Sequence, residues 1–276
     1  MLKARVATAI VLLGVFLSAL FMLPTRQFAI LVGAVVAAGA FEWATLAKAA
    51  GRGSYFYATL CACLYAAVVW GAQAIDPSRP DVAGLYALAA LFWILAVPLW
   101  LAYGLRFPSR TIALAVGIVV VVPAGLSIVS LHSIAPQVLL MFLALVWVAD
   151  IAAYFTGRAF GRHKLAPAIS PGKTWEGVAG ALAATMLYAI VCATISPLLV
   201  ATIRGGLWVP YLGVAVVLCA ISIVGDLFES SVKRQAAAKD SGTLLPGHGG
   251  VLDRIDSITS TLPVAALLFY LTAGGG

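Results

Sequence analysis

Charged residues are scarce in this 276-residue chain: they make up 10% of it, against about 25% in a typical soluble domain. Hydrophobic residues make up 63%. So little charge on so much apolar surface excludes a soluble globular fold. The composition instead indicates an all-α protein, a polytopic bundle of helices that lies within a lipid bilayer.

Potential metal ligands are also few, with four cysteines and three histidines. The cysteines fall inside apolar runs without metal-site spacing, which favours inert packing. They are Cys61, Cys63, Cys192 and Cys219. A Walker A loop is missing too: Ser170–Thr174 resembles one superficially, but Pro167 stands where glycine is needed, and no preceding strand is expected. The proline at position 167 and the lack of an expected strand exclude a P-loop nucleotide hydrolase.

Long apolar runs dominate the chain, and about 20 apolar residues span a bilayer. The sequence predicts nine spans, near residues 6–23, 28–47, 55–75, 82–104, 111–130, 136–156, 175–200, 207–229 and 256–273. The first run has no small-residue cleavage site, so a retained helix is expected rather than a signal peptide. We divide the chain into N-terminal helices at 1–135 and a catalytic region at 136–276.

The basic residues predict the orientation of these helices. Fourteen of the 17 fall on one side of the predicted membrane, and the positive-inside rule makes that side cytosolic. The N-terminus is then cytosolic and the C-terminus outside, in the cytoplasmic (inner) membrane. The loops at 157–174 and 230–255 face the cytosol, where nucleotides are found. Topology therefore explains the net charge of +7, and no nucleic-acid partner is expected.

Half of the ten acidic residues lie within residues 226–256. They are Asp226, Glu229, Asp240, Asp253 and Asp256. Helical spacing puts Asp226, Glu229, Ser230 and Lys233 on one face. Hard oxygen donors beside cations suit Mg²⁺ and a polyphosphate. The simpler alternative is an ion pair between Asp226 and Lys233 or a cation of another helix.

A glycine-rich turn precedes the last apolar run. Gly249 and Gly250 allow close approach of the backbone to a ligand, and Asp253 and Asp256 can share a face of the helix that follows. Carboxylates there also complement the helix dipole, which is the simpler interpretation for one of them. His248 is equally suited to bind metal, donate a proton or stabilise the turn.

A second polar cluster covers residues 150–177, where Asp150, Tyr154 and Arg158 lie about one helical turn apart. Lys173, at the entry of a helix, can hold a phosphate as a point charge. Alternatively, it is a lysine that extends to the membrane surface. Glu42 is interpreted as an interfacial residue, and His132 as a solvated residue in an external loop.

Residues 230–256 resemble the signature of the phosphatidate cytidylyltransferase (CDP-diacylglycerol synthase) family. The matching positions are Ser230, Lys233, Arg234, Lys239, Asp240, His248, Gly249, Gly250, Asp253, Arg254 and Asp256. The specific resemblance covers roughly residues 147–256, since Ser170–Gly177 and the Asp150–Arg158 segment also look like that family. The first five helices agree only in hydropathy.

This resemblance implies that CTP and phosphatidic acid give CDP-diacylglycerol and pyrophosphate in a membrane enzyme that is often a homodimer. It implies that Mg²⁺ is required, together with a second ion that is either Mg²⁺ or a monovalent cation. It implies metal ligands at Asp226, Asp253 and Asp256. The implied catalytic residues are Asp226, Lys233, Asp240, His248, Asp253, Arg254 and Asp256. The implied substrate-binding residues are Lys173, Ser230, Lys233, Arg234, Lys239, Gly249 and Gly250.

Two other functions fit parts of the pattern. A CTP-dependent lipid-alcohol kinase, or another lipid-phosphate nucleotidyltransferase, would use similar residues on a different acceptor. A secondary transporter also carries charges within the membrane and broken helices. It explains poorly why the polar motifs gather on one side.

Overall fold

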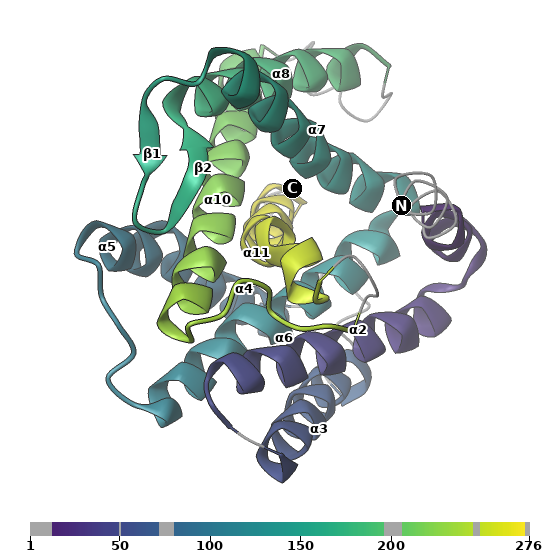
Figure 1. Cartoon of the computed structure of the whole chain (residues 1–276). Coiled ribbons are helices and arrows are strands. Elements are labelled where there is room, and N and C mark those ends of the chain that lie inside the picture. Colours follow the sequence, from purple (N-terminus) through teal and green to yellow (C-terminus); the bar gives the residue numbers. More distant parts are fainter. Residues whose placement is uncertain (1–12, 50, 72–79, 196–205, 245–248, 274–276) are drawn as a thin grey trace.

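The structure is a computed structural model that describes residues 13–49, 51–71, 80–195, 206–244 and 249–273, and Figure 1 shows it as a bundle of helices. The long elements are α2 (Thr25–Leu46), α3 (Arg52–Ala66), α4 (Pro80–Leu91), α5 (Val97–Ala102), α6 (Arg110–Ile134), α7 (Pro136–Phe160), α8 (Trp175–Ile195), α10 (Trp208–Gln235) and α11 (Leu252–Ala273). Short π-helices continue α3 and α4 at Ala67–Gly71 and Phe92–Ala96. An apolar helix at Leu13–Met22 precedes α2.

Each of the nine predicted spans overlaps a helix. Within the described ranges, seven helices are long and apolar enough to cross a membrane. The helix at Leu13–Met22 is shorter, and α11 begins with the charged segment 253–256. An all-α polytopic membrane protein is therefore confirmed, whereas nine crossings and the orientation of the termini stay predictions. The division at residue 135 also stays a prediction.

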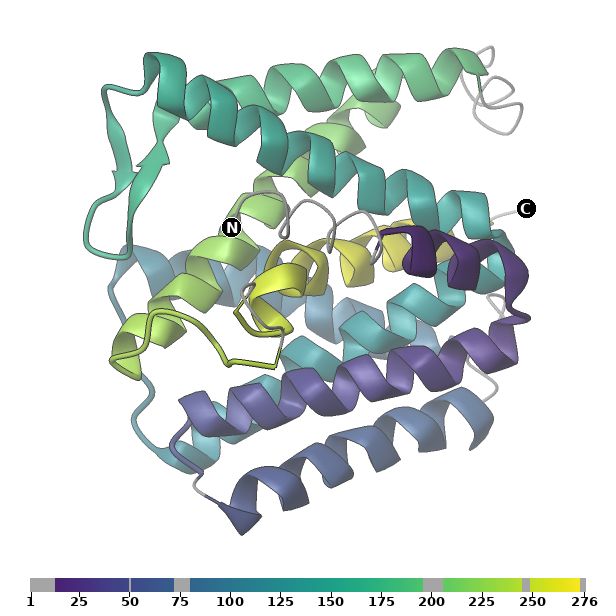
Figure 2. The same cartoon turned by 45° about the vertical axis from the view of Figure 1, so that its right-hand side comes forward.

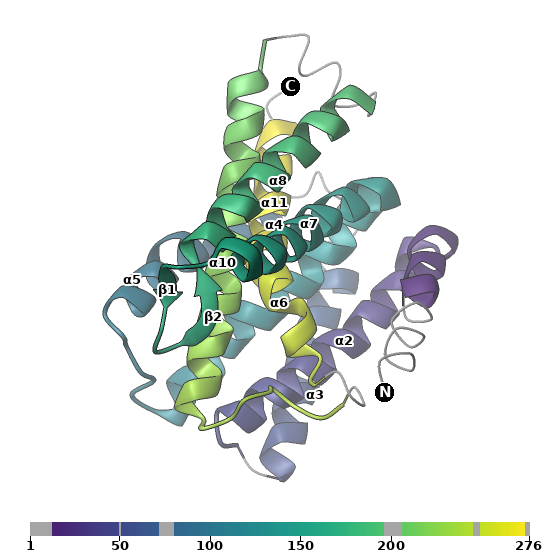
Figure 3. The ribbon, with the colours of Figure 1, turned by 45° about the horizontal axis from the view of Figure 1, so that its top comes forward.

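The polar motifs gather at one end of the bundle. In Figures 2 and 3, the last turns of α2, α7 and α10 point toward the same end as the first turns of α3, α6, α8 and α11. Contacts between connecting segments agree with the pictures: Gln235 Nε2 donates to the Leu105 carbonyl (3.1 Å) and Arg234 Nε to the Ile169 carbonyl (3.2 Å). Both predicted motif loops therefore lie on one side of the apolar bundle.

Helix α11 lies at the centre of this arrangement, as Figure 1 shows. It packs against α10, α6, α4, α7 and α2. Several of its buried polar side chains find partners within the bundle; for example, Ser260 Oγ donates to the Ile221 carbonyl of α10 (3.0 Å). Ser257 Oγ is buried without a hydrogen-bond partner among the described residues. The N-terminal helices thus surround the helix that begins with the acidic residues Asp253 and Asp256.

An aromatic cluster fixes α10 beside its neighbours. The Phe228 ring lies 5.6 Å from the rings of Phe92 and Trp93, 6.0 Å from Trp100 and 6.2 Å from Trp43, centroid to centroid. Such aromatic pairs contribute about 0.5–1.5 kcal/mol each beyond the area they bury. Because Phe228 lies between Asp226 and Glu229, this packing also sets the position of the acidic face of α10.

Two expectations were wrong. Strand β1 (Lys164–Ala166) does precede Ser170, and it pairs antiparallel with β2 (Ser170–Thr174). The hairpin forms because the chain turns back between α7 and α8. His132 is not solvated: it is 3% exposed, stacks on Phe28, and its ring nitrogens contact the Leu20 carbonyl and the Thr25 hydroxyl.

Candidate active site

The acidic residues of α10 and α11 approach one another at a close helix contact. A Cβ atom at Gly225 would lie 2.2 Å from Ser260 Oγ and 2.9 Å from the Asp256 carbonyl oxygen, so glycine is required there. Asp226, the next residue, interacts electrostatically with Asp256, and Asp150 of α7 interacts with both. Three carboxylates that are distant in the sequence therefore lie in one region.

The β-hairpin brings a cation to these carboxylates. Lys173 of β2 places its Nζ atom 2.7 Å from Asp226 Oδ2, with about a quarter of either side chain exposed. Ser230 Oγ donates to the other oxygen, Asp226 Oδ1 (3.3 Å). Asp226 thus forms an ion pair, but with Lys173 of a strand rather than with Lys233 or a cation of another helix. This pair is compatible with a phosphate site, because the same ammonium group can bind an anion.

A second ion pair lies further along the same helix. Lys233 Nζ is 2.6 Å from Asp253 Oδ1 and 3.2 Å from Glu229 Oε1, and the three side chains are 6–13% exposed. Glu229 Oε2 is buried and has no hydrogen-bond partner among the described residues. Lys233 thus lies between two carboxylates in a largely water-excluded place, where electrostatic interactions are stronger than in water.

The backbone amides of Ser241 and Gly250 hold Asp253 from the other side. Asp253 Oδ2 accepts hydrogen bonds from the Ser241 and Gly250 amides, both at 2.9 Å. Because Asp253 lies in the first turn of α11, the interpretation that one carboxylate complements the helix dipole is compatible with Asp253. The same carboxylate also binds Lys233, and its interaction with the helix dipole is therefore only part of what it does.

Steric constraints within the turn explain why glycine occupies positions 249 and 250. Gly249 has φ +81°, a conformation that favours glycine. A Cβ atom there would also lie 2.9 Å from Asp253 Oδ2, and one at Gly250 would lie 2.0 Å from Ser241 Oγ. Their assignment to substrate stays a prediction, because the fold of the turn already requires glycine at both positions.

The remaining predicted residues lie around these ion pairs. Arg234, Lys239, Asp240 and Arg254 are exposed at the same end of the bundle, and Arg234 is tied to the hairpin through its bond to the Ile169 carbonyl. His248 lies outside the described residues. The part of the chain that the structure describes contains no group of three or more His, Cys, Asp or Glu side chains arranged to hold a metal.

Glu176 anchors the hairpin that carries Lys173. Its carboxylate accepts hydrogen bonds from the Arg162 and His163 amides (3.1–3.3 Å) and contacts His163 Nδ1 at 2.6 Å. We expect Glu176→Gln to loosen the hairpin, and trypsin to cleave after Lys164 several-fold faster in detergent. An unchanged cleavage rate would contradict this anchoring role.

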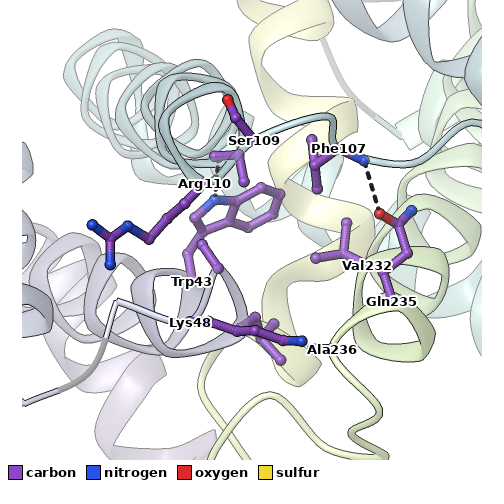
Figure 4. A pocket seen from close by; sticks show the side chains of 11 residues that line it. Trp43, Lys48, Phe107, Ser109, Arg110, Val232, Gln235 and Ala236 are labelled. Carbon is purple, nitrogen blue, oxygen red and sulfur yellow. Dashed lines mark hydrogen bonds between the residues drawn. The ribbon is translucent and has the colours of Figure 1, made fainter.

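A cavity of the described residues lies elsewhere in the bundle. It has a volume of about 420 Å³ and lies between α2, the segment before α6, and α10. Figure 4 shows Trp43, Phe107 and Gln235 in its wall, with the Phe107 amide donating to Gln235 Oε1. Gln235 is nine residues after Asp226, on the opposite side of α10 at about 100° per residue. This cavity is not the place of the ion pairs.

Comparisons with known proteins cover almost the whole sequence of this chain. The model of the cytidylyltransferase family matches residues 3–272. The chain belongs to that family. The phosphatidate cytidylyltransferase of Pseudomonas aeruginosa is 43% identical over 282 residues, which cover 100% of this chain and 99% of that protein. The enzyme of the same name from Haemophilus influenzae is 37% identical over 98% of this chain and 99% of its own length. The one from Brucella suis is 52% identical over 133 residues, 48% of this chain and 45% of that protein.

Family membership confirms the resemblance that the motif at 230–256 suggested, and it extends to the N-terminal helices. Those helices supply a residue that the sequence did not place in the site. Glu42 of α2 is 1% exposed and contacts the loop beside Asp253. The interfacial interpretation of Glu42 was therefore wrong, because the carboxylate points into the bundle. The available signal was a single carboxylate in an apolar run, which is costly unless it has partners.

Proposed function

We propose that this protein transfers CMP from CTP to phosphatidic acid and releases CDP-diacylglycerol and pyrophosphate. The observation that carries the proposal is the full-length similarity to phosphatidate cytidylyltransferases. Two lysine–aspartate pairs at one end of an apolar bundle support it, because anionic phosphates need cations and the lipid acceptor needs a bilayer. The partners are then CTP, phosphatidic acid and the membrane.

The reaction requires positioning more than a strong base. A phosphate oxygen of the lipid attacks the α-phosphorus of CTP, a new P–O bond forms, and the bond to the β-phosphate oxygen breaks as pyrophosphate leaves. The attacking group is already an anion, so the main obstacle is bringing two anions together. Lys173 and Lys233 would each release a carboxylate in part to bind a phosphate oxygen. Arg234 and Arg254 would add positive charge at the exposed side of the site.

The donor chemistry of the site fits Mg²⁺. Carboxylate oxygens are the hard ligands that Mg²⁺ prefers, usually one or two of them together with substrate phosphates. We propose that Asp226, Asp253 and Asp256 provide them, and that Asp240 and His248 orient the neighbouring groups. The ion would supply neutralisation of the charge on the leaving pyrophosphate. A second ion, of unknown type, is part of the same proposal.

The membrane arrangement follows the distribution of charge. We propose that the end of the bundle with the ion pairs faces the cytosol, because nearly all described basic residues lie there and CTP is a cytosolic nucleotide. Nine helices, a cytosolic N-terminus, an external C-terminus and residence in the cytoplasmic (inner) membrane belong to this proposal. A homodimer is proposed from the family resemblance alone.

Labelled CTP tests the function directly. Purified protein in detergent, given phosphatidic acid, Mg²⁺ and CTP labelled at the α-phosphate, should transfer the label into lipid. The pyrophosphate that it releases should carry no label. Transfer of γ-label into a lipid alcohol would identify a kinase instead. Absence of any turnover, with substrate movement in proteoliposomes, would identify a transporter.

A further inference from the structure

Glu42 is buried near the end of α2, with an exposed fraction of 1%. Both of its oxygens accept hydrogen bonds from a segment about 200 residues later in the chain. Oε1 accepts from the Val251 amide (2.9 Å), and Oε2 accepts from the Leu252 amide (2.9 Å) and Ser241 Oγ (3.0 Å). An exposed interfacial carboxylate would have none of these contacts.

The amides that Glu42 binds belong to the start of α11. Helices leave their first four N–H groups without partners inside the helix, and these attract negative charge. Residues at the cap of a helix usually supply the acceptor themselves. Here the acceptor comes from another helix, so α2 and α11 are fixed to one another at this point.

Two glycines leave room for the carboxylate. A Cβ atom at Gly242 would lie 2.5 Å from Glu42 Oε1 and 2.9 Å from its Cγ, and one at Gly250 would lie 2.5 Å from Oε2. Gly250 was assigned to substrate by the sequence resemblance. The contact with Glu42 gives a reason for glycine there that does not involve a ligand.

The segment that Glu42 holds is the one that positions Asp253. Ser241 donates its hydroxyl to Glu42, while its amide and the Gly250 amide donate to Asp253 Oδ2. Asp253 Oδ1 in turn contacts Lys233 Nζ at 2.6 Å. Glu42 is thus connected to the second ion pair of the site through one short stretch of backbone, although it does not touch that pair.

We propose that Glu42 is a positioning residue of the active site, which fixes Ser241, Val251 and Leu252 so that Asp253 and Lys233 keep their geometry for reaction. This rests on the proposed cytidylyl transfer. Outer partners that orient groups at a catalytic centre typically account for about 10–100-fold in activity or affinity. Displacement of reacting groups by about 1 Å has effects of similar size.

Glu42→Gln keeps the size of the side chain but replaces one acceptor oxygen with an NH₂ group that faces hydrogen-bond donors. We expect kcat for cytidylyl transfer to fall about 10–100-fold with little change in the KM for CTP, because Glu42 does not face the substrates. Thr45→Ala, one turn further along α2 and exposed, is the matched control and should keep normal kcat. A normal kcat in Glu42→Gln would overturn the proposal. The same holds for a variant whose whole defect is a higher KM for CTP with kcat unchanged.

A double-mutant cycle separates positioning from a general loss of folding. Gly242→Ala alone should displace the Glu42 carboxylate and lower kcat. In a Glu42→Ala background the clash is removed, so Gly242→Ala should lower kcat no further. Effects that multiply across the two positions would overturn the proposal. The thermal unfolding midpoints of wild type, Glu42→Ala, Gly242→Ala and the double variant in detergent should show the same non-additivity. This measurement does not require that the wild-type protein transfers CMP. Wild-type inactivity would therefore reject the proposed function, and additive midpoints would reject the role of Glu42.

Discussion

Asp253→Asn is expected to reduce cytidylyl transfer at least about 1000-fold, the upper range for removing one preorganised electrostatic group. Asparagine has nearly the same shape and still offers an oxygen to the Ser241 and Gly250 amides. It removes the charge that neutralises Lys233, and with it a proposed Mg²⁺ ligand. Turnover of labelled CTP by purified protein measures the effect.

Membrane insertion should survive this change, because the apolar helices are intact. Asp81→Asn, which removes a carboxylate from a residue that has no role in the proposed site, is the matched control and should leave turnover normal. Near-normal rates of Asp253→Asn at low Mg²⁺ would reject its assignment to metal. Loss of the folded protein in detergent would instead show that the Lys233 pair is needed mainly for stability, since breaking a buried pair costs about 3–5 kcal/mol.

Lys173→Ala is expected to lower kcat/KM about 10–100-fold, because a hydrogen bond to a charged group contributes about 1.5–3 kcal/mol and about 1.4 kcal/mol corresponds to tenfold. Most of the effect should appear as a higher KM for CTP or phosphatidic acid, because an ammonium group binds phosphate before and during reaction. Initial rates over a range of both substrates measure it. Asp226 would lose its contact with Lys173 and keep the hydrogen bond from the Ser230 hydroxyl.

Lys164→Ala is the control for this prediction. Lys164 is an exposed lysine of β1 on the same hairpin, so its replacement removes the same charge from the same element. It should leave kcat/KM within a fewfold of wild type. An unchanged kinetic profile in Lys173→Ala would return Lys173 to a role in membrane topology.

The helical fold and the C-terminal half of the site could be predicted from the sequence. Long apolar runs can satisfy their backbone hydrogen bonds only as helices in a bilayer, so their positions follow from hydropathy. Asp226, Lys233 and Asp253 stand out because charge is rare in such a chain. Their spacing also places Asp226 and Lys233 on one helix face, as the structure shows.

Pairing between distant elements could not be predicted in the same way. Periodicity shows that Lys173 is near a helix entry, but not that a short hairpin carries it to Asp226. For Glu42 the sequence offers only one carboxylate in an apolar run. Its partners are mostly backbone amides, which every residue except proline possesses, so no side-chain pattern marks them.

The contact between α2 and the start of α11 can form only after almost the whole chain has been synthesised. Glu42 is synthesised early, whereas its three donors leave the ribosome about 200 residues later. Until then the carboxylate lacks the partners that satisfy it in the complete bundle, and an unsatisfied polar group that is buried destabilises the fold. Chains that stop short of residue 241 therefore lack all three donors, and their N-terminal helices keep a carboxylate that the complete protein satisfies.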